Sequence, residues 1–116
     1  MMIIYDDPGG RVYDYVQQEV MLSESRAAIK FKGQCDSACT VYLGLPADQL
    51  CVTPQASFRF HEPFGSTLSD RAAAKKYMWN NYPAWVRNWI NANGGWNSTL
   101  ITMPYAYARR FIKECA

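Results

Sequence analysis

The stretch of sequence that decides the fold is residues 28–61, AIKFKGQCDSACTVYLGLPADQLCVTPQASFRFH. Apolar and basic side chains alternate over Ala28–Gly33, which is the pattern of a strand with one buried face. The mostly apolar segment Ser37–Leu43 is expected to form a buried helix, and further strand patterns follow at Leu50–Thr53 and Ala56–His61. Strands on both sides of a buried helix indicate βαβ units, in which the strands run parallel.

The rest of the chain extends this alternation of strands and helices in both directions. Toward the N-terminus we expect a strand at Ile3–Tyr5, a turn at residues 6–10 and an amphipathic helix at Arg11–Leu22, and a second turn is expected at residues 33–36. Toward the C-terminus we expect a helix from Ser69, its N-cap, to Asn80, a helix over Ala84–Asn93 beyond Pro83, a strand at Thr99–Met103 and a helix from Pro104 to Lys113. This order predicts a single α/β domain over residues 1–116 with a mostly parallel sheet.

Composition excludes several classes of protein. The 12 basic and 10 acidic residues are dispersed along the chain and leave a net charge of +2, so no nucleic-acid partner is expected. No stretch of about 18 apolar residues is present, so no membrane span is expected. His61 is the single histidine, which excludes His-rich metal sites and makes His61 the one candidate for an imidazole base. We expect neither a metal nor a cofactor.

The four cysteines point to the compartment of the protein. An even set of cysteines in a short chain favours two disulfides and an oxidising compartment, and the spacing C-x3-C-x11-C-x63-C is not that of a zinc site. Residues 1–5, MMIIY, do not form a secretory signal. We therefore expect a periplasmic or secreted protein if a leader has been removed, and a cytoplasmic protein otherwise.

Three groups lie where predicted strands end, the place at which reactive groups gather in open parallel sheets. Ser37 lies at a strand-to-helix turn, where the first N–H groups of the helix could stabilise an oxyanion. Gly9 and Gly10 follow the first strand and allow a close backbone approach, and His61 ends a later strand. Each residue taken alone has a plainer interpretation, as a helix cap, a turn or a structural histidine. Their combination in this order favours a functional site.

The three segments that hold these residues resemble the ClpP/crotonase superfamily, to which the proteolytic subunit of Clp protease belongs. They are residues 5–10, YDDPGG, residues 33–39, GQCDSAC, and residues 60–65, FHEPFG. The segment from Tyr82 to Ile90, of the form YPxxVRxWI, adds a closer likeness to short ClpP-like proteins of bacteria, which usually carry an export signal. The likeness runs from Ile3 to Cys115 and implies a minimal, single-domain version of the ClpP/crotonase-like fold.

The resemblance implies a serine hydrolase, most simply a peptidase, that acts by acyl transfer without a cofactor. Ser37 would be the nucleophile and His61, 24 residues later, its general base. The oxyanion would be held by the backbone N–H groups of Gly10 and Ala38. A peptide or protein would be the substrate.

One departure from the superfamily pattern puts catalysis in question. ClpP-type peptidases supply an aspartate before the final helix, whereas this chain has no aspartate after Asp70. Asn97 is the candidate third member at that place, and Asp36, Asp70 and Glu62 are the other candidates. The alternative is therefore a catalytically inactive ClpP-like module that binds a peptide or protein. A crotonase-like acyl-CoA site is a third alternative, which the pairing of a serine with a histidine disfavours.

The resemblance also gives the cysteines and the aromatic residues a context. A disulfide from Cys35 or Cys39 to Cys51 would pin the turn around Ser37, and Cys115 would tie down the C-terminal helix. The alternative is that the cysteines are small buried apolar residues. Five aromatic residues are open to two interpretations, core packing or a peptide-binding or self-association surface of a homo-oligomer. They are Trp79, Tyr82, Trp85, Trp89 and Trp96.

Overall fold

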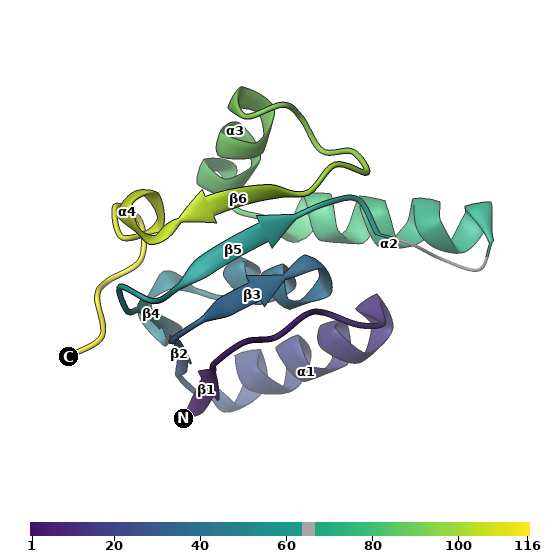
Figure 1. Cartoon of the computed structure of the whole chain (residues 1–116). Coiled ribbons are helices and arrows are strands. Elements are labelled where there is room, and N and C mark those ends of the chain that lie inside the picture. Colours follow the sequence, from purple (N-terminus) through teal and green to yellow (C-terminus); the bar gives the residue numbers. More distant parts are fainter. Residues whose placement is uncertain (64–66) are drawn as a thin grey trace.

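Two three-stranded sheets form the centre of the computed structural model, which describes residues 1–63 and 67–116 (Figure 1). In the first sheet, β1 (Met2–Ile4), β2 (Ile29–Phe31) and β4 (Leu50–Val52) lie in the order β1-β2-β4 and are all parallel. In the second sheet, β5 (Ser57–Phe60) lies between β3 (Gln34–Asp36), which is parallel to it, and β6 (Ile101–Pro104), which is antiparallel. The predicted α/β class with mostly parallel strands is confirmed.

The two sheets meet at Gly33, where the chain bends between β2 and β3. A Cβ atom on Gly33 would lie 1.3 Å from the carbonyl oxygen of Tyr5, so the bend admits only glycine. Beyond the bend the chain pairs again, because Asp7 forms a parallel bridge with Cys35 and β3 pairs with β5. The predicted turn at residues 33–36 is therefore wrong, since only Gly33 bends and Gln34–Asp36 are strand.

Between β3 and β4 the chain forms η1, a 3₁₀ helix over Ser37–Gly44, and a short 3₁₀ turn, η2, over Ala47–Gln49. The residues from Ala38 to Leu43 are all buried, and η1 packs against α1 (Val12–Ser25), β3, β5 and α2 (Leu68–Asn81). A helix that is apolar on every side is stable only when it is buried in the interior. The predicted buried helix over Ser37–Leu43 is thus present as a 3₁₀ helix at the centre of the fold.

The remaining helices differ from the predictions at their ends. α2 has Thr67 as its N-cap, not Ser69, because the Thr67 hydroxyl accepts the N–H of Asp70 at 3.0 Å. α3 covers Ala84–Ala92, and α4 covers only Tyr105–Ala108. The predicted extension of the last helix to Lys113 is wrong, because the backbone of residues 113–115 pairs with Val52 of β4 instead.

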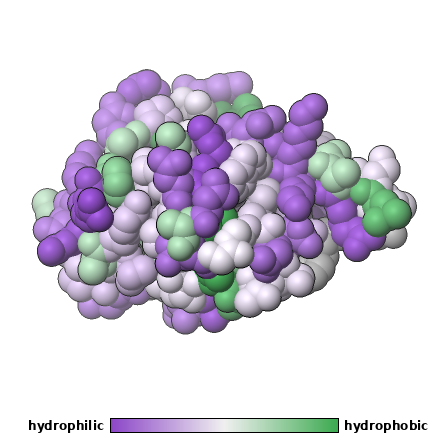
Figure 2. Space-filling model, turned by 90° about the horizontal axis from the view of Figure 1, so that it is seen from above, coloured by the Kyte–Doolittle hydropathy of each residue, from purple (hydrophilic) through white to green (hydrophobic). Residues whose placement is uncertain are grey.

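Apolar residues from both sheets, η1, α2 and α3 form one core, whose largest fully buried side chains include Phe31, Phe58, Phe60, Tyr82 and Ile90. The face of the molecule in Figure 2 is largely hydrophilic, with small, scattered apolar patches. Within residues 1–63 and 67–116, no helix is long and apolar enough to cross a membrane. In this fold the ends of β3 and β5 lie beside each other, and the predicted site residues Ser37 and His61 follow these two ends.

Candidate functional site

Ser37 lies at the turn from β3 into η1 and has a left-handed backbone conformation, with φ of +55°. A residue with a β-carbon avoids this region, and it is tolerated mainly where the surrounding structure imposes it. Such strain is concentrated at active sites, and a nucleophilic serine on a sharp strand-to-helix turn is one known form of it. The conformation of Ser37 therefore sets it apart from an ordinary helix cap.

A disulfide between Cys35 and Cys39 encloses the Ser37 turn. The two residues lie at its ends with their Cα atoms 5.3 Å apart, and both are fully buried. Cys51 pairs instead with Cys115, so the expected bridge from the Ser37 turn to Cys51 is wrong. The reason is the C-terminal segment, which runs beside β4 and brings Cys115 to Cys51. The expectation of two disulfides is confirmed.

The turn at Gly9 and Gly10 lies directly against the Ser37 turn. A Cβ atom on Gly9, which has φ of +87°, would lie 2.7 Å from the Asp36 carbonyl oxygen and 3.0 Å from Cβ of Ser37. Asp7 holds this turn, because its Oδ1 accepts the N–H of Gly9 at 2.9 Å. The next amide along the chain, that of Gly10, is then the candidate oxyanion donor. Gly9 and Ser37, 28 residues apart in the sequence, are thus neighbours.

An ion pair joins the ends of β3 and β5. Arg59 donates to both carboxylate oxygens of Asp36, from Nε at 2.8 Å and from Nη2 at 2.5 Å. Hydrogen bonding to Asp36 raises the pKa of Arg59. Bidentate pairs of this kind fix geometry as well as charge. The carboxylate of Asp36 is therefore directed to Arg59, in the strand that leads to His61.

His61 follows β5 on the strand next to the one that ends at Ser37. Asp36 is paired with Arg59 in register, so Ser37 comes one residue after this pair and His61 two residues after it. Neighbouring strands lie about 4.8 Å apart, which brings the two residues to the same end of the sheet. His61 is half-buried, and its Nδ1 lies 2.8 Å from the main-chain carbonyl oxygen of Glu62.

The main chain of Asn97 contacts the histidine segment, which is residues 61–63 after β5. Its carbonyl oxygen accepts the N–H of Glu62 at 2.8 Å. The side chain of Asn97 is used within its own loop, where Oδ1 accepts the N–H of Thr99 at 2.8 Å and Nδ2 donates to the carbonyl oxygen of Gly94 at 3.2 Å. The main chain of Asn97 thus lies beside Glu62, the residue that follows His61, while the side-chain amide group of Asn97 is engaged in its own loop.

The other acidic candidates also have defined places. The carboxylate of Glu62 accepts a hydrogen bond from Nζ of Lys75 at 2.8 Å. Asp70 is exposed in the first turn of α2. The last two residues of the third motif, Phe64 and Gly65, lie outside the described residues.

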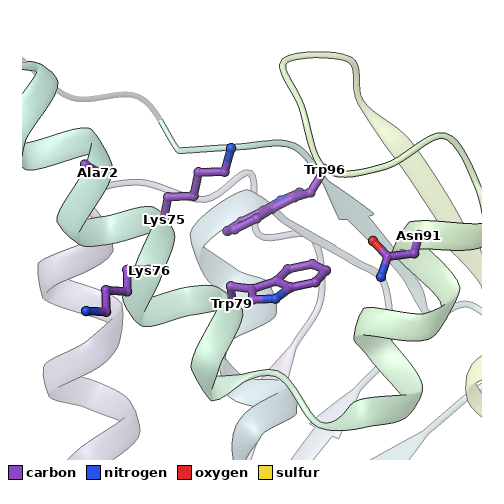
Figure 3. Close-up of a pocket in the computed structure, with 6 residues that line it drawn as sticks. All are labelled: Ala72, Lys75, Lys76, Trp79, Asn91 and Trp96. Atoms are coloured by element: carbon purple, nitrogen blue, oxygen red, sulfur yellow. The ribbon is translucent and has the colours of Figure 1, made fainter.

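A pocket of about 490 Å³ adjoins this segment and is lined by Ala72, Lys75, Lys76, Trp79, Asn91 and Trp96 (Figure 3). The indoles of Trp79 and Trp96 stack with their centroids 5.5 Å apart, and Lys75 extends over the Trp96 ring. Lys75 also bonds Glu62, so the pocket and the histidine segment share a side chain.

The five aromatic residues all belong to the core or pack against it, and two of them also line the pocket. Tyr82 and Trp89 are buried in the core, and burial raises the pKa of Tyr82. Trp79 and Trp96 are half-buried and line the pocket, while Trp85 stacks on Phe111 near the C-terminus.

Sequence reasoning missed two residues that shape the site, Asp7 and Arg59. Asp7 anchors the glycine turn, and its Oδ1 also accepts the hydroxyl of Tyr15 at 2.5 Å. Asp36 lies inside the second motif and Arg59 lies one residue before the third, but their pairing needs the strand register, which the sequence does not reveal. The available signal was a basic residue on the polar side of an alternating strand, directly before the third motif.

No model of a known protein family matches the chain, and no curated protein matches it. Among solved structures, the chain is similar to a mutant of ClpP1 from Listeria monocytogenes, with 12% sequence identity and a TM-score of 0.46. The similarity covers 98% of this chain and 91% of that chain. At this level of similarity no residue role passes from one protein to the other.

Proposed function

We propose that the protein is a serine hydrolase of the peptidase type, with Ser37 as nucleophile and His61 as general base. The observation that supports it best is the left-handed backbone of Ser37 at a strand-to-helix turn, enclosed by a disulfide and in contact with the Gly9 turn. A plain helix cap needs none of these features, whereas a serine that must expose its hydroxyl beside oxyanion donors needs a sharp turn.

The reaction is acyl transfer in two steps. The Ser37 oxygen bonds to the carbonyl carbon of the substrate while Nε2 of His61 takes the hydroxyl proton. The N–H groups of Gly10 and Ala38 stabilise the oxyanion, and Ala38 is suited to this because the first N–H groups of a helix have no partner within it. His61 then returns the proton to the leaving amine, and water releases the acyl group by the reverse sequence.

The surroundings of the site support a peptide or protein substrate in an oxidising compartment. The two disulfides fit a periplasmic or secreted protein, because such bridges persist mainly outside the cytoplasm. The pocket formed by Trp79, Trp96 and Lys75 would accept an apolar or aromatic side chain of the substrate close to the histidine segment.

The alternative is a module of the same fold that binds a peptide without cleaving it. The observation that favours this function is the side chain of Asn97, which bonds Thr99 and Gly94 in its own loop. An imidazole without an acidic partner is a weaker catalyst, and losing the acid from a triad can cost about 10⁴-fold in rate. The pocket would then serve binding alone.

Covalent labelling separates the two functions. The purified, oxidised protein is incubated with a fluorophosphonate probe between about pH 6 and pH 9, the range in which such bases operate. We expect one probe per chain on Ser37, and no labelling of Ser37→Ala or His61→Ala. Ser69→Ala, which removes an exposed serine from α2, is the matched control and should label normally. A folded protein that takes no probe under these conditions would favour the binding module.

A further inference from the structure

The contact between His61 and Glu62 determines which nitrogen of the ring is protonated. Nδ1 of His61 lies 2.8 Å from the main-chain carbonyl oxygen of Glu62. A carbonyl oxygen can only accept a hydrogen bond, so Nδ1 is the donor and bears the proton. In the neutral ring Nε2 is then unprotonated, which is the form that a general base for Ser37 requires.

The residue that supplies this carbonyl, Glu62, is itself held in place by two contacts and by the proline that follows it. The N–H of the same residue donates to the main-chain carbonyl of Asn97 at 2.8 Å, and its carboxylate is bonded by Lys75 at 2.8 Å. The carbonyl belongs to the peptide bond with Pro63, which is buried. A proline restricts the backbone of the residue before it to extended conformations, so the direction of this carbonyl is narrowly defined.

We propose that the main-chain carbonyl of Glu62 orients the His61 ring in the place that a carboxylate occupies in a Ser-His-Asp triad. Asn97 is then a positioning residue that acts through its own carbonyl on the Glu62 peptide, and its amide group is not the third member. This inference rests on the proposed function for its catalytic meaning. Two of the acids that could have served are already engaged, Asp36 by Arg59 and Glu62 by Lys75.

The proton balance of the first step follows from this arrangement. When the Ser37 oxygen forms its bond to the substrate carbonyl carbon, Nε2 of His61 gains the hydroxyl proton and Nδ1 keeps its own. The resulting imidazolium faces the Glu62 carbonyl dipole instead of a full negative charge. Its stabilisation is therefore smaller than in a triad with a carboxylate, because bonds between two ions are stronger than bonds to a neutral acceptor. The protein is expected to be a slow hydrolase.

The first test reads the protonated nitrogen directly and needs no activity. His61 is the single histidine, so the long-range proton–nitrogen NMR spectrum of protein labelled with nitrogen-15 contains one ring. At about pH 9, where a histidine ring is ordinarily neutral, we expect Nδ1 to be protonated and Nε2 to be unprotonated. A spectrum in which Nε2 bears the proton would overturn the proposal.

The second test compares two substitutions by the rate of fluorophosphonate labelling. Asn97→Asp places a carboxylate where a triad would need one, and we expect no gain in rate because this side chain serves its own loop. If the Asn97 side chain were the third member, the gain could reach about 10⁴-fold, the factor by which an asparagine in place of the aspartate slows a triad. A gain above about tenfold would contradict the proposal.

Pro63→Gly frees the direction of the Glu62 carbonyl without removing it. We expect the protonation of Nδ1 to become mixed and the labelling rate to fall by about 10-fold to 100-fold, the scale of a small misplacement in an active site. Pro54→Gly, at an exposed turn, is the matched control and should change neither quantity. If Pro63→Gly does not fold, the spectrum of the unmodified protein and Asn97→Asp decide the matter. A folded Pro63→Gly protein with the unmodified spectrum and rate would overturn the proposal.

The two proposals fail in distinguishable ways. A protein with Nδ1 protonated that takes no probe would retain the orientation of His61 by Glu62 and refute the hydrolase. A protein that is labelled at Ser37 but has Nε2 protonated would retain the hydrolase and refute the role of the Glu62 carbonyl.

Discussion

Replacing Ser37 by glycine should stabilise the protein relative to replacing it by alanine. A residue with a β-carbon at positive φ costs about 1–2 kcal/mol, and glycine avoids this cost. Glycine has its own disadvantage, because it loses about 0.5–1 kcal/mol more conformational entropy on folding than alanine. The difference leaves Ser37→Gly more stable than Ser37→Ala by about 0.75 kcal/mol. Both substitutions remove the hydroxyl, so the comparison isolates the backbone.

Ala73→Gly provides the control with the opposite sign. Ala73 is exposed in the interior of α2, where the backbone is an ordinary right-handed helix. A glycine in such a place is less favourable than alanine by about 0.8–1 kcal/mol. The same exchange of alanine for glycine should therefore stabilise the protein at position 37 and destabilise it at position 73.

The assay is unfolding by urea at neutral pH without reductant, followed by circular dichroism. For a domain of this size, 1 kcal/mol corresponds to about 4 °C in Tm, which a parallel thermal scan resolves. The reasoning would be refuted if Ser37→Ala were the more stable variant by about 0.5 kcal/mol or more. In that case Ser37 would have an ordinary backbone, and the strongest structural support for its role as nucleophile would be lost.

Three further predictions concern the disulfides and the pH dependence of stability. Replacing Cys51 and Cys115 together by alanine should lower the free energy of unfolding by about 4 kcal/mol, because their bridge closes a loop of 64 residues in sequence; a loss below about 1 kcal/mol in urea titrations would contradict this. Replacing Cys35 and Cys39 together should lower the free energy of unfolding by about 2 kcal/mol, because their bridge closes a much shorter loop. The replacement should also slow fluorophosphonate labelling of the enclosed Ser37, and an unchanged labelling rate would show that the disulfide does not hold the Ser37 turn in its reactive form. Burial raises the pKa of Tyr42 to about 12 from 10.0, so stability should fall as the pH rises above 10, where the unfolded chain loses this proton before the folded protein does. Tyr42→Phe should remove part of that decline between about pH 10 and pH 12, and equal declines in both proteins would show that Tyr42 has no part in it.

Most of the strands could be predicted because their information is local. Alternation of apolar and polar side chains identifies Ile29–Phe31 and Ser57–Phe60 whatever their partners. The strand at Gln34–Asp36 could not be predicted, since it depends on contact with Asp7 and with β5, which are distant in the sequence. Without that contact, a glycine followed by polar residues reads as a turn.

The predictions of the disulfide pairing and of the length of the last helix are wrong for the same reason. Both depend on residues 113–115, which lie beside Val52 and so place Cys115 next to Cys51. Four cysteines allow three pairings, and no property of the sequence near Cys115 indicates which strand it joins. Tertiary pairing of this backbone also overrides the helical pattern of the preceding residues.

The candidate site could be predicted as a set of residues but not as a geometry. Ser37 and Gly9 are found from their positions at strand ends, and the fold brings them into contact. The link between Asn97 and Glu62 runs through main-chain atoms, which every residue possesses, so no side-chain motif could signal it. The side-chain amide of Asn97 suggested a catalytic role, whereas in the structure it bonds Thr99 and Gly94 within its own loop.

The measurement that tests the account most directly is the trapping of an acyl-enzyme. The oxidised protein is mixed with a chromogenic ester, quenched in acid within the first turnover, and its intact mass and peptide masses are determined. The account predicts one acyl group per chain, on Ser37, together with a matching burst of the leaving group, and neither in Ser37→Ala. An acyl group on another residue, or a folded protein that acquires none, would contradict the assignment of Ser37 as the nucleophile.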